Sequence, residues 1–238
     1  MKPRIREAVL SDAAALGALY AEAFATNARY RHVFQCADEA SHAHALTWLF
    51  QRRVVMALRG GCPFLVSECE QPAVQEGASP TRRLLAAAAL VPHSRKAGPL
   101  DWLACGLATW PFLHGIASMM RALALYADSP PCAGGDEGEV VMVAVRTDSQ
   151  GRGVGSGVVR ELLSQWDSRG GGAAVLSTQS ERNVTFYQRL GFTLDCVPTG
   201  AKPGPYENFT LRREKRALAP CGADQGRDES GQGPSRGA

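Results

Sequence analysis

The apolar positions near the start of the chain predict one short strand followed by two helices. Arg4 to Val9 has the character of a strand, and Ser11-Asp12 then offers an N-cap for an Ala/Leu-rich helix from Ala13 to Phe24. A second helix is predicted from Glu39 to Leu58, because its apolar residues recur at helical spacing and form a broad apolar surface. The chain therefore opens as a strand that leads into a helical layer.

Three strands are predicted in the middle of the chain. Pro63 to Ser67 and Leu84 to Val91 are separated by a region that bears Gly, Pro and Ser, which predicts a hairpin. Glu139 to Val145 is the most strand-like segment, and its nearly continuous apolar character is typical of a central strand covered on both faces.

The following segments alternate between helix and strand. A helix from Val154 to Trp166 and a strand from Ala173 to Ser177 complete a strand, helix, strand unit, whose two strands should pair in parallel or splay at a shared end. A helix from Asn183 to Leu190 should end in a left-handed cap at Gly191. Two further strands are predicted, Phe192 to Val197 and Tyr206 to Leu211. The pattern predicts an α/β fold.

One apolar segment interrupts this order. From Trp102 to Met120 there is no Asp, Glu, Lys or Arg, and the segment approaches the length of a membrane span. Pro111 and Gly115 break it, and no topology-setting charge cluster flanks it. We therefore expect a helical insertion over residues 98–128 and no membrane partner.

Composition places the chain among globular proteins. Apolar residues make up 45% and charged residues 21%, with a formal net charge of +3 and scattered arginines, so nucleic acid is not an expected partner. The seven cysteines are odd in number and never form a CxxC pair, which favours reduced thiols and a cytoplasmic location. One domain over residues 1–213 and a disordered tail over residues 214–238 are predicted.

No metal site is expected. His42 and His44 lie two positions apart on a predicted helix and therefore do not share a face. The other histidines have no partner at ligand spacing.

The segment with the clearest chemistry is the glycine-rich turn from Gln150 to Gly157. It lies between the strand Glu139 to Val145 and an apolar-faced helix, where backbone N–H groups and the helix dipole favour an anion such as a pyrophosphate. The Gly-Lys-Ser/Thr of a nucleotide P-loop is absent, and Val158 occupies the last glycine position of a dinucleotide motif. With these two phosphate-binding motifs excluded, the turn still matches a Q/R-x-x-G-x-G/A pattern, which Gln150, Gly153 and Gly155 fill.

This pattern resembles that of the GCN5-related N-acetyltransferase (GNAT) superfamily. The block from Asn183 to Phe192 is similar to the family's N-x-x-x-(F/Y)-Y-x-x-x-G-F sequence, and Val143 to Val145 resembles the strand that precedes its loop. The layout is most similar to that of puromycin N-acetyltransferase-like members. The resemblance implies a mixed, mostly antiparallel sheet flanked by helices, with a V-shaped acetyl-CoA cleft after Val145.

The resemblance also implies roles for individual residues. Tyr187 would be the general acid for the departing thiolate, since a phenol with a pKa of about 10 can protonate a thiolate whose conjugate acid has a pKa of about 8.5. The Asn183 side chain would bind the pantetheine arm. Main-chain groups of the strand and loop would bind acetyl-CoA at Val143, Val145, Gln150, Gly151, Arg152, Gly153, Val154, Gly155 and Ser156.

The acceptor and the base are less constrained by the sequence. Glu139 lies six positions before Val145, where histone-acetylating members keep a glutamate, so it is the candidate base; Asp136, Glu137 or a water chain are alternatives.

The activity implied is direct transfer of the acetyl group, in a ternary complex, from acetyl-CoA to a primary amine of a small molecule. A protein N-terminal or lysine acetyltransferase and a catalytically silent CoA-binding module are the alternatives.

Overall fold

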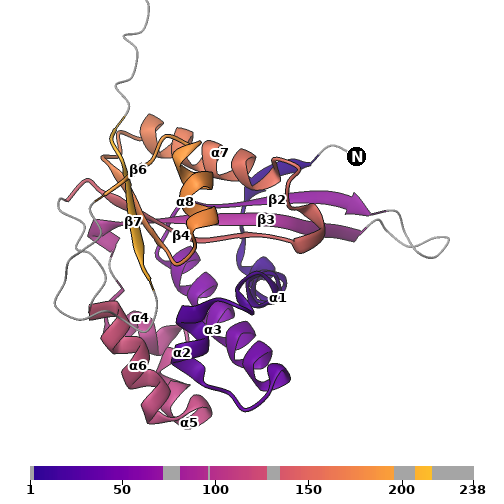
Figure 1. The fold of residues 1–238 in the computed structure, drawn as a ribbon, viewed down its shortest axis with the longest axis vertical. Coiled ribbons are helices and arrows are strands. Elements are labelled where there is room, and N and C mark those ends of the chain that lie inside the picture. The colour runs from indigo at the N-terminus through magenta and orange to yellow at the C-terminus, as the bar shows by residue number, and fades with distance from the viewer. Residues whose placement is uncertain (1–2, 72–80, 96, 128–134, 196–206, 216–238) are drawn as a thin grey trace, which may run out of the picture.

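A seven-stranded sheet forms the centre of the molecule. The computed structural model describes residues 3–71, 81–95, 97–127, 135–195 and 207–215. In these residues the strand order is β1-β2-β3-β4-β5-β7-β6, and every neighbouring pair is antiparallel except β4 and β5 (Figure 1). The strands are β1 (Arg4–Glu7), β2 (Phe64–Gln71), β3 (Thr81–Pro92), β4 (Gly138–Val145), β5 (Ala174–Thr178), β6 (Thr193–Leu194) and β7 (Phe209–Arg213).

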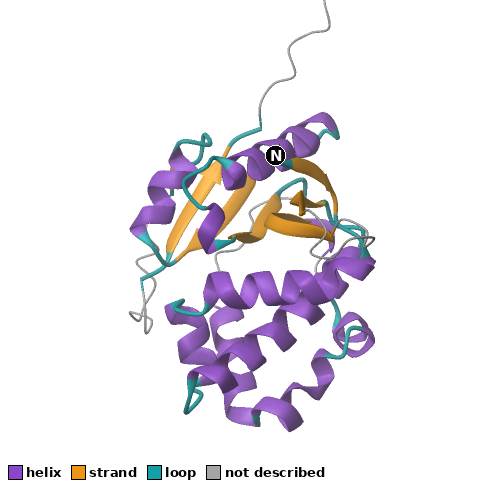
Figure 2. Cartoon of the chain, turned by 90° about the vertical axis from the view of Figure 1, so that its right-hand side faces the viewer, coloured by secondary structure: helices purple, strands orange, loops and turns teal. Residues whose placement is uncertain are grey.

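Helices cover both faces of this sheet, as the views in Figures 1 and 2 agree. The α-helices are α1 (Ala13–Phe24), α2 (Ala28–Phe34), α3 (Glu39–Arg59), α4 (Pro99–Ala104), α5 (Trp110–His114), α6 (Ile116–Ala127), α7 (Val154–Ser168) and α8 (Glu181–Gln188). The predicted α/β class with a mostly antiparallel sheet is confirmed.

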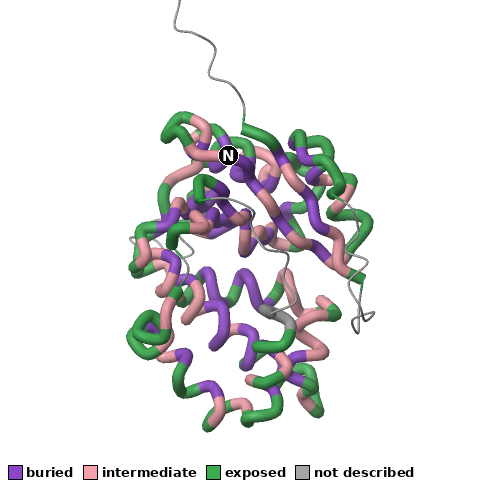
Figure 3. Tube along the Cα trace, turned by 90° about the vertical axis from the view of Figure 1, so that its left-hand side faces the viewer, coloured by how far each residue is buried: buried purple, intermediate pink, exposed green. Residues whose placement is uncertain are grey.

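Two apolar cores lie between the sheet and the helices, one on each face of the sheet. The buried residues of the strands and of the helices that cover them form these cores (Figure 3). One core joins the sheet to α1, α2 and α3, with side chains such as Leu16, Phe50 and Met142. The other joins it to α7 and α8, with Val140, Leu162 and Tyr187. Side chains alternate between the faces of a strand, so the core that a residue joins identifies the face to which it points.

Several predicted boundaries move. The predicted hairpin is present as β2 and β3, which pair in antiparallel register from Phe64↔Ala89 to Gln71↔Thr81 and are longer than predicted at the turn. Gly191 has the predicted left-handed conformation, with φ of +91°. The strand predicted at Phe192 to Val197 shortens to β6, and its last two residues lie outside the described part of the chain. From residue 216 onward the predicted tail also lies outside it.

The segment between β3 and β4 forms α4, α5 and α6. Within the described residues, no helix has both the length and the apolar character of a membrane span. The segment packs on the helical layer through Trp110, whose indole stacks on Phe34 of α2 at 5.5 Å and donates a hydrogen bond to the Ser118 hydroxyl at 2.7 Å.

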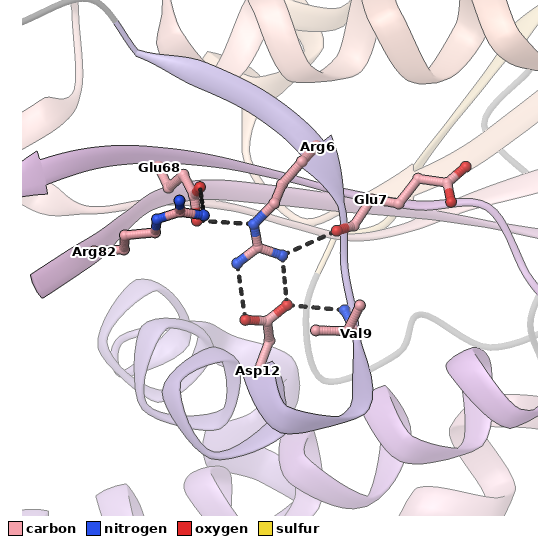
Figure 4. A network of polar contacts seen from close by, with 6 residues as sticks. All are labelled: Arg6, Glu7, Val9, Asp12, Glu68 and Arg82. Carbon is pink, nitrogen blue, oxygen red and sulfur yellow. Dashed lines mark hydrogen bonds and ion pairs between the residues drawn. The ribbon is translucent and has the colours of Figure 1, made fainter.

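A polar network ties the first strand to its neighbours (Figure 4). The Arg6 guanidinium donates to both Asp12 carboxylate oxygens at 2.7 and 2.9 Å, and to Glu68 of β2 at 2.8 Å. Arg82 of β3 donates to the other Glu68 oxygen at 3.1 Å. Asp12 precedes α1 directly, so the network fixes the start of that helix against the sheet edge.

Candidate functional site

The two parallel strands of the sheet separate soon after they meet. β4 and β5 pair only at Gly138↔Ala174 and Glu139↔Val175, and beyond this point β4 stays with β3 while β5 stays with β7. The result is a wedge between the two strands, whose facing edges are not paired with each other. The sequence places the opening after Val145, but the wedge already begins after Glu139.

A bulge in β4 accounts for the early opening. Ala89 pairs with Val141 and Ala87 with Ala144, so Met142 and Val143 together oppose Ala88 alone. Met142 has φ of +50°, and Val141 and Met142 both pack on the α1–α3 side. A bulge bends its strand and takes backbone groups out of the ladder. Because methionine rarely adopts positive φ, no signal in the sequence marks this position.

The glycine-rich turn lies at the end of β4, beside the wide end of the wedge. Gly151 and Gly153 have φ of +75° and +76°, values that residues with a Cβ adopt only with strain. Gly153 is the N-cap of α7, and its carbonyl accepts the Gly157 N–H at 2.9 Å. The first N–H groups of α7, including those of Val154, Gly155 and Ser156, have no acceptor within their own helix and are suited to an anion.

Two further contacts hold this turn close to β4. The Gln150 side-chain amide donates to the Val145 carbonyl at 3.3 Å. A methyl group built on Gly155 would lie 2.6 Å from Cγ2 of Val145, so this glycine permits α7 to pack close to β4. Arg152 is exposed beside the turn.

α8 carries the other two predicted coenzyme residues. Asn183 and Tyr187 are four positions apart and therefore lie on the same helix face. The Asn183 amide donates to the Thr178 hydroxyl at the end of β5 at 3.0 Å. Tyr187 is 8% exposed and packs on Phe186 and Phe192, and this burial raises the pKa of its phenol well above the usual value.

Glu139 lies at the narrow end of the wedge. Its neighbour Val140 joins the α7–α8 core, so the Glu139 side chain points to the α1–α3 face. The alternative base Glu137 is buried, and its carboxylate accepts a hydrogen bond from Arg212 at 2.6 Å. Asp136 is exposed. The structure thus places Glu139 at the wedge, on the face opposite α7 and α8.

Sequence reasoning missed the contacts that clamp the loop between β4 and the glycine turn. Glu22 of α1 accepts the Thr147 N–H at 3.2 Å and forms an ion pair with Arg146 at 3.7 Å. Asp148 is paired with Arg83 of β3. These residues are distant along the chain, and no local pattern links them.

A pocket of about 560 Å³ also lies in the helical layer, lined by Phe34, Cys36, Ala40, Ser41, His44, Leu113 and His114. It contains none of the predicted coenzyme residues. The wedge, with the glycine turn and α8 beside it, is therefore the better candidate for chemistry. Across the described residues, His, Cys, Asp and Glu form no group of three suited to a metal ion.

Comparison with known proteins gives two findings. Residues 115–194 match the family model of the acetyltransferase (GNAT) domain. The fold is similar to that of a Corynebacterium glutamicum protein named histone acetyltransferase HPA2 and related acetyltransferase, with 17% identity, a TM-score of 0.56, and coverage of 92% of this chain and 99% of that one.

Two other solved structures share the fold. The PaiA N-acetyltransferase of Thermoplasma acidophilum, solved with coenzyme A, has 12% identity and a TM-score of 0.51 over 90% of this chain and 99% of that one. The phosphinothricin acetyltransferase of Sinorhizobium meliloti, solved with AcCoA, has 16% identity and a TM-score of 0.50 over 90% of this chain and 89% of that one.

Proposed function

We propose that this chain, of which residues 115–194 match the GNAT acetyltransferase domain, is an acetyl-CoA-dependent acyltransferase that transfers the acetyl group to a primary amine of a small molecule. The observation that carries the proposal is the wedge between β4 and β5, which ends at a glycine turn and a helix N-terminus. An elongated ligand with a thioester at one end and a pyrophosphate at the other matches this arrangement.

In the proposed complex, the coenzyme lies between the strands on the α7–α8 side. The turn from Gln150 to Gly155, with Ser156, binds the pyrophosphate through main-chain N–H groups, and Arg152 adds a charge at the solvent side. Main-chain groups of Val143 and Val145 hold the pantetheine arm and the acetyl carbonyl along the bulged strand. The Asn183 amide binds the pantetheine arm from α8.

The chemistry follows from this placement. Glu139 takes a proton from the bound ammonium, and the free amine nitrogen then attacks the thioester carbonyl carbon. Backbone N–H groups at the β4 bulge stabilise the oxyanion. When the carbon–sulfur bond breaks, the Tyr187 phenol protonates the departing thiolate, and the resulting phenolate takes back a proton from the nitrogen that has become the amide. Transfer is direct, so no acetylated protein residue is needed, and holding the amine beside the thioester supplies much of the rate.

The helical layer supports a small acceptor. The amine must approach the thioester from the face that the coenzyme does not occupy, which is the face covered by α1, α2 and α3. The α5 and α6 region packs on this helical layer, where Trp110 of α5 stacks on Phe34 of α2. It therefore adds a second set of helices on that face of the sheet. A covered approach favours a compact amine over a folded protein surface.

The test is to follow thiol release from acetyl-CoA with a panel of small primary amines and a panel of peptides with free N-termini or lysines. Turnover on the free amines is the expected result. Turnover on peptides alone would contradict a small-molecule acceptor. Calorimetric binding of acetyl-CoA with no thiol release on either panel would instead indicate a catalytically silent CoA-binding module.

A further inference from the structure

The face of the sheet that the acceptor must use carries a polar patch, which we define as Ser177, Gln179, Asn208 and Thr210. We propose that Gln179 and Thr210 are specificity-determining residues that select an amine bearing an uncharged hydrogen-bonding group, a hydroxyl or a carboxamide. The inference rests on the proposed function, because it requires that the coenzyme occupy the α7–α8 side of the wedge.

The orientation of the patch follows from the two cores. Ala174 and Leu176 of β5 and Leu211 of β7 all pack against α7 and α8. The alternating residues Ser177 and Thr210 therefore point to the opposite face, where α1, α2 and α3 lie. Ser177 pairs directly with Thr210 across the two strands. Glu139, the proposed base, points to the same face at the narrow end of the wedge.

Gln179 and Asn208 are the next residues on the same face of the two strands, two positions beyond Ser177 and Thr210. The Gln179 amide nitrogen donates to the Asn208 side-chain oxygen at 2.8 Å. Asn27, between α1 and α2, donates in turn to the Gln179 side-chain oxygen at 3.2 Å. Since α1 packs over β3 and β4 while Gln179 directly follows β5, this chain of amides spans the wide end of the wedge.

Thr210 provides an independent observation. The residue is only 6% exposed, and its hydroxyl oxygen is buried with no hydrogen-bond partner. A buried polar group without a partner is unfavourable and calls for an explanation such as a missing ligand. A hydroxyl or carboxamide of a bound acceptor would supply the partner. Thr210 pairs with Ser177, and one residue pair, Thr178 and Phe209, separates this pair from Gln179 and Asn208.

The chemistry and spacing of the patch define the acceptor. Hydroxyl and amide side chains both donate and accept but carry no charge, so they match uncharged polar groups. Glu139 of β4 pairs with Val175 of β5, Ser177 is two residues further along β5, and its partner Thr210 lies on the next strand, β7. A rise of about 3.4 Å per residue and a strand spacing of about 4.8 Å place the backbone of Thr210 roughly 12 Å from that of Glu139. Hydrogen bonds of about 3 Å at each end leave roughly 6–7 Å, so we expect a primary amine with a hydroxyl or amide about this far from the nitrogen.

The experiment compares two amines of similar length, 5-aminopentan-1-ol and hexylamine. The wild-type enzyme should prefer the amino alcohol in kcat/KM by about tenfold, because a site built to hydrogen-bond a hydroxyl rejects the analogue that lacks it. Thr210→Val and Gln179→Leu should each move this ratio toward one by raising KM for the amino alcohol. KM for acetyl-CoA should not change.

Ser67→Ala is the matched control. Ser67 on β2 is also buried, at 1% exposure, with an unpartnered hydroxyl, but it lies outside the wedge. Its removal should leave the ratio at the wild-type value. Equal use of the two amines by the wild type, or an unchanged ratio in both patch variants, would overturn the inference.

A second readout separates this inference from the proposed function. If no amine releases thiol, the proposed function fails, and saturation-transfer NMR on the CoA-bound protein then tests the patch by binding alone. Stronger binding of 5-aminopentan-1-ol than of hexylamine, lost in Thr210→Val, would support the patch as a polar amine site. Equal binding would overturn it.

Discussion

Tyr187 combines a reactive group with deep burial. Burial raises the pKa of its phenol, so the hydroxyl stays protonated throughout the neutral range and is available as a proton donor. We expect Tyr187→Phe to lower kcat by about 100-fold, within the usual contribution of a general acid, and to leave acetyl-CoA affinity nearly unchanged. Thiol-release kinetics and calorimetry measure the two effects separately.

Tyr20 offers the comparison for this variant. It is completely buried in the α1–α3 core, and its hydroxyl has no hydrogen-bond partner. Tyr20→Phe therefore removes the same atom from a site without chemistry and should retain wild-type kcat. Wild-type kcat in Tyr187→Phe would show that the thiolate leaves without help from this phenol.

At the scale of the element, the packing of α7 on β4 decides whether the proposed coenzyme-binding turn keeps its shape. A methyl group at Gly155 would lie 2.6 Å from Cγ2 of Val145, so the helix or the Val145 side chain must shift to accept it. We expect Gly155→Ala to weaken acetyl-CoA binding by about tenfold, since a displacement of the N–H groups weakens each anion contact. Calorimetry gives the dissociation constant.

Gly157, two residues after Gly155 in the first turn of α7, allows a matched substitution. Its added methyl group would meet only Ile5 at 3.8 Å, an ordinary contact, and alanine favours a helix more than glycine does. Gly157→Ala should therefore bind acetyl-CoA like the wild type with equal or greater thermal stability. Equal binding by both variants would mean that α7 is not held against β4 for the coenzyme.

The elements differ in how much of them the sequence predicts. α1 and α7 begin where they are predicted because apolar periodicity and a cap or glycine signal coincide there. The short helix α2 was not predicted, although Asn27 is its N-cap and accepts the Arg29 N–H at 3.0 Å, which is a local signal. The bulge at Met142, by contrast, has no local signal, because the register with β3 defines it and the residue type does not.

The site shows the same division. The glycine turn and the α8 residues follow from local sequence, as each set occupies one continuous segment. The loop clamp at Glu22 and Thr147 and the amide contact of Asn27 with Gln179 join residues separated by 125 and 152 positions. Such contacts depend on the packed layers, so local sequence gives no signal for them.

Across the whole molecule, the layers are tied together at the sheet edge by the Arg6 network. Glu68 is almost fully buried and shares its two oxygens between Arg6 and Arg82, while Arg6 continues to Asp12 at the start of α1 (Figure 4). One guanidinium thus connects β1, β2 and the helical layer. Removal of a partner leaves a buried charge incompletely paired, which costs more than an exposed pair would.

Asp12→Asn tests this connection through its pH dependence. Burial alone would raise the pKa of Asp12, but hydrogen bonds from Arg6 and from the Val9 N–H outweigh it and lower the pKa below the ordinary value. The ionised carboxylate therefore stabilises the fold above the unfolded-state pKa of about 3.9, and this contribution disappears as the pH falls through the lower folded-state value. We expect Asp12→Asn to lose about 1–2 kcal/mol of unfolding free energy at pH 7.

In urea titrations the loss should shrink toward zero as the pH falls below the unfolded-state pKa of about 3.9 and through the lower folded-state pKa, where the wild-type carboxyl also becomes neutral. Glu161→Gln, on the exposed face of α7, changes a carboxylate to an amide without disturbing the network and should leave the unfolding free energy at pH 7 within about 0.5 kcal/mol of the wild type. A deficit in Asp12→Asn that stays constant from pH 7 to pH 3 would mean that the variant damages packing. A deficit that closes with acid would assign the stabilisation to the ionised pair that holds α1 to the sheet.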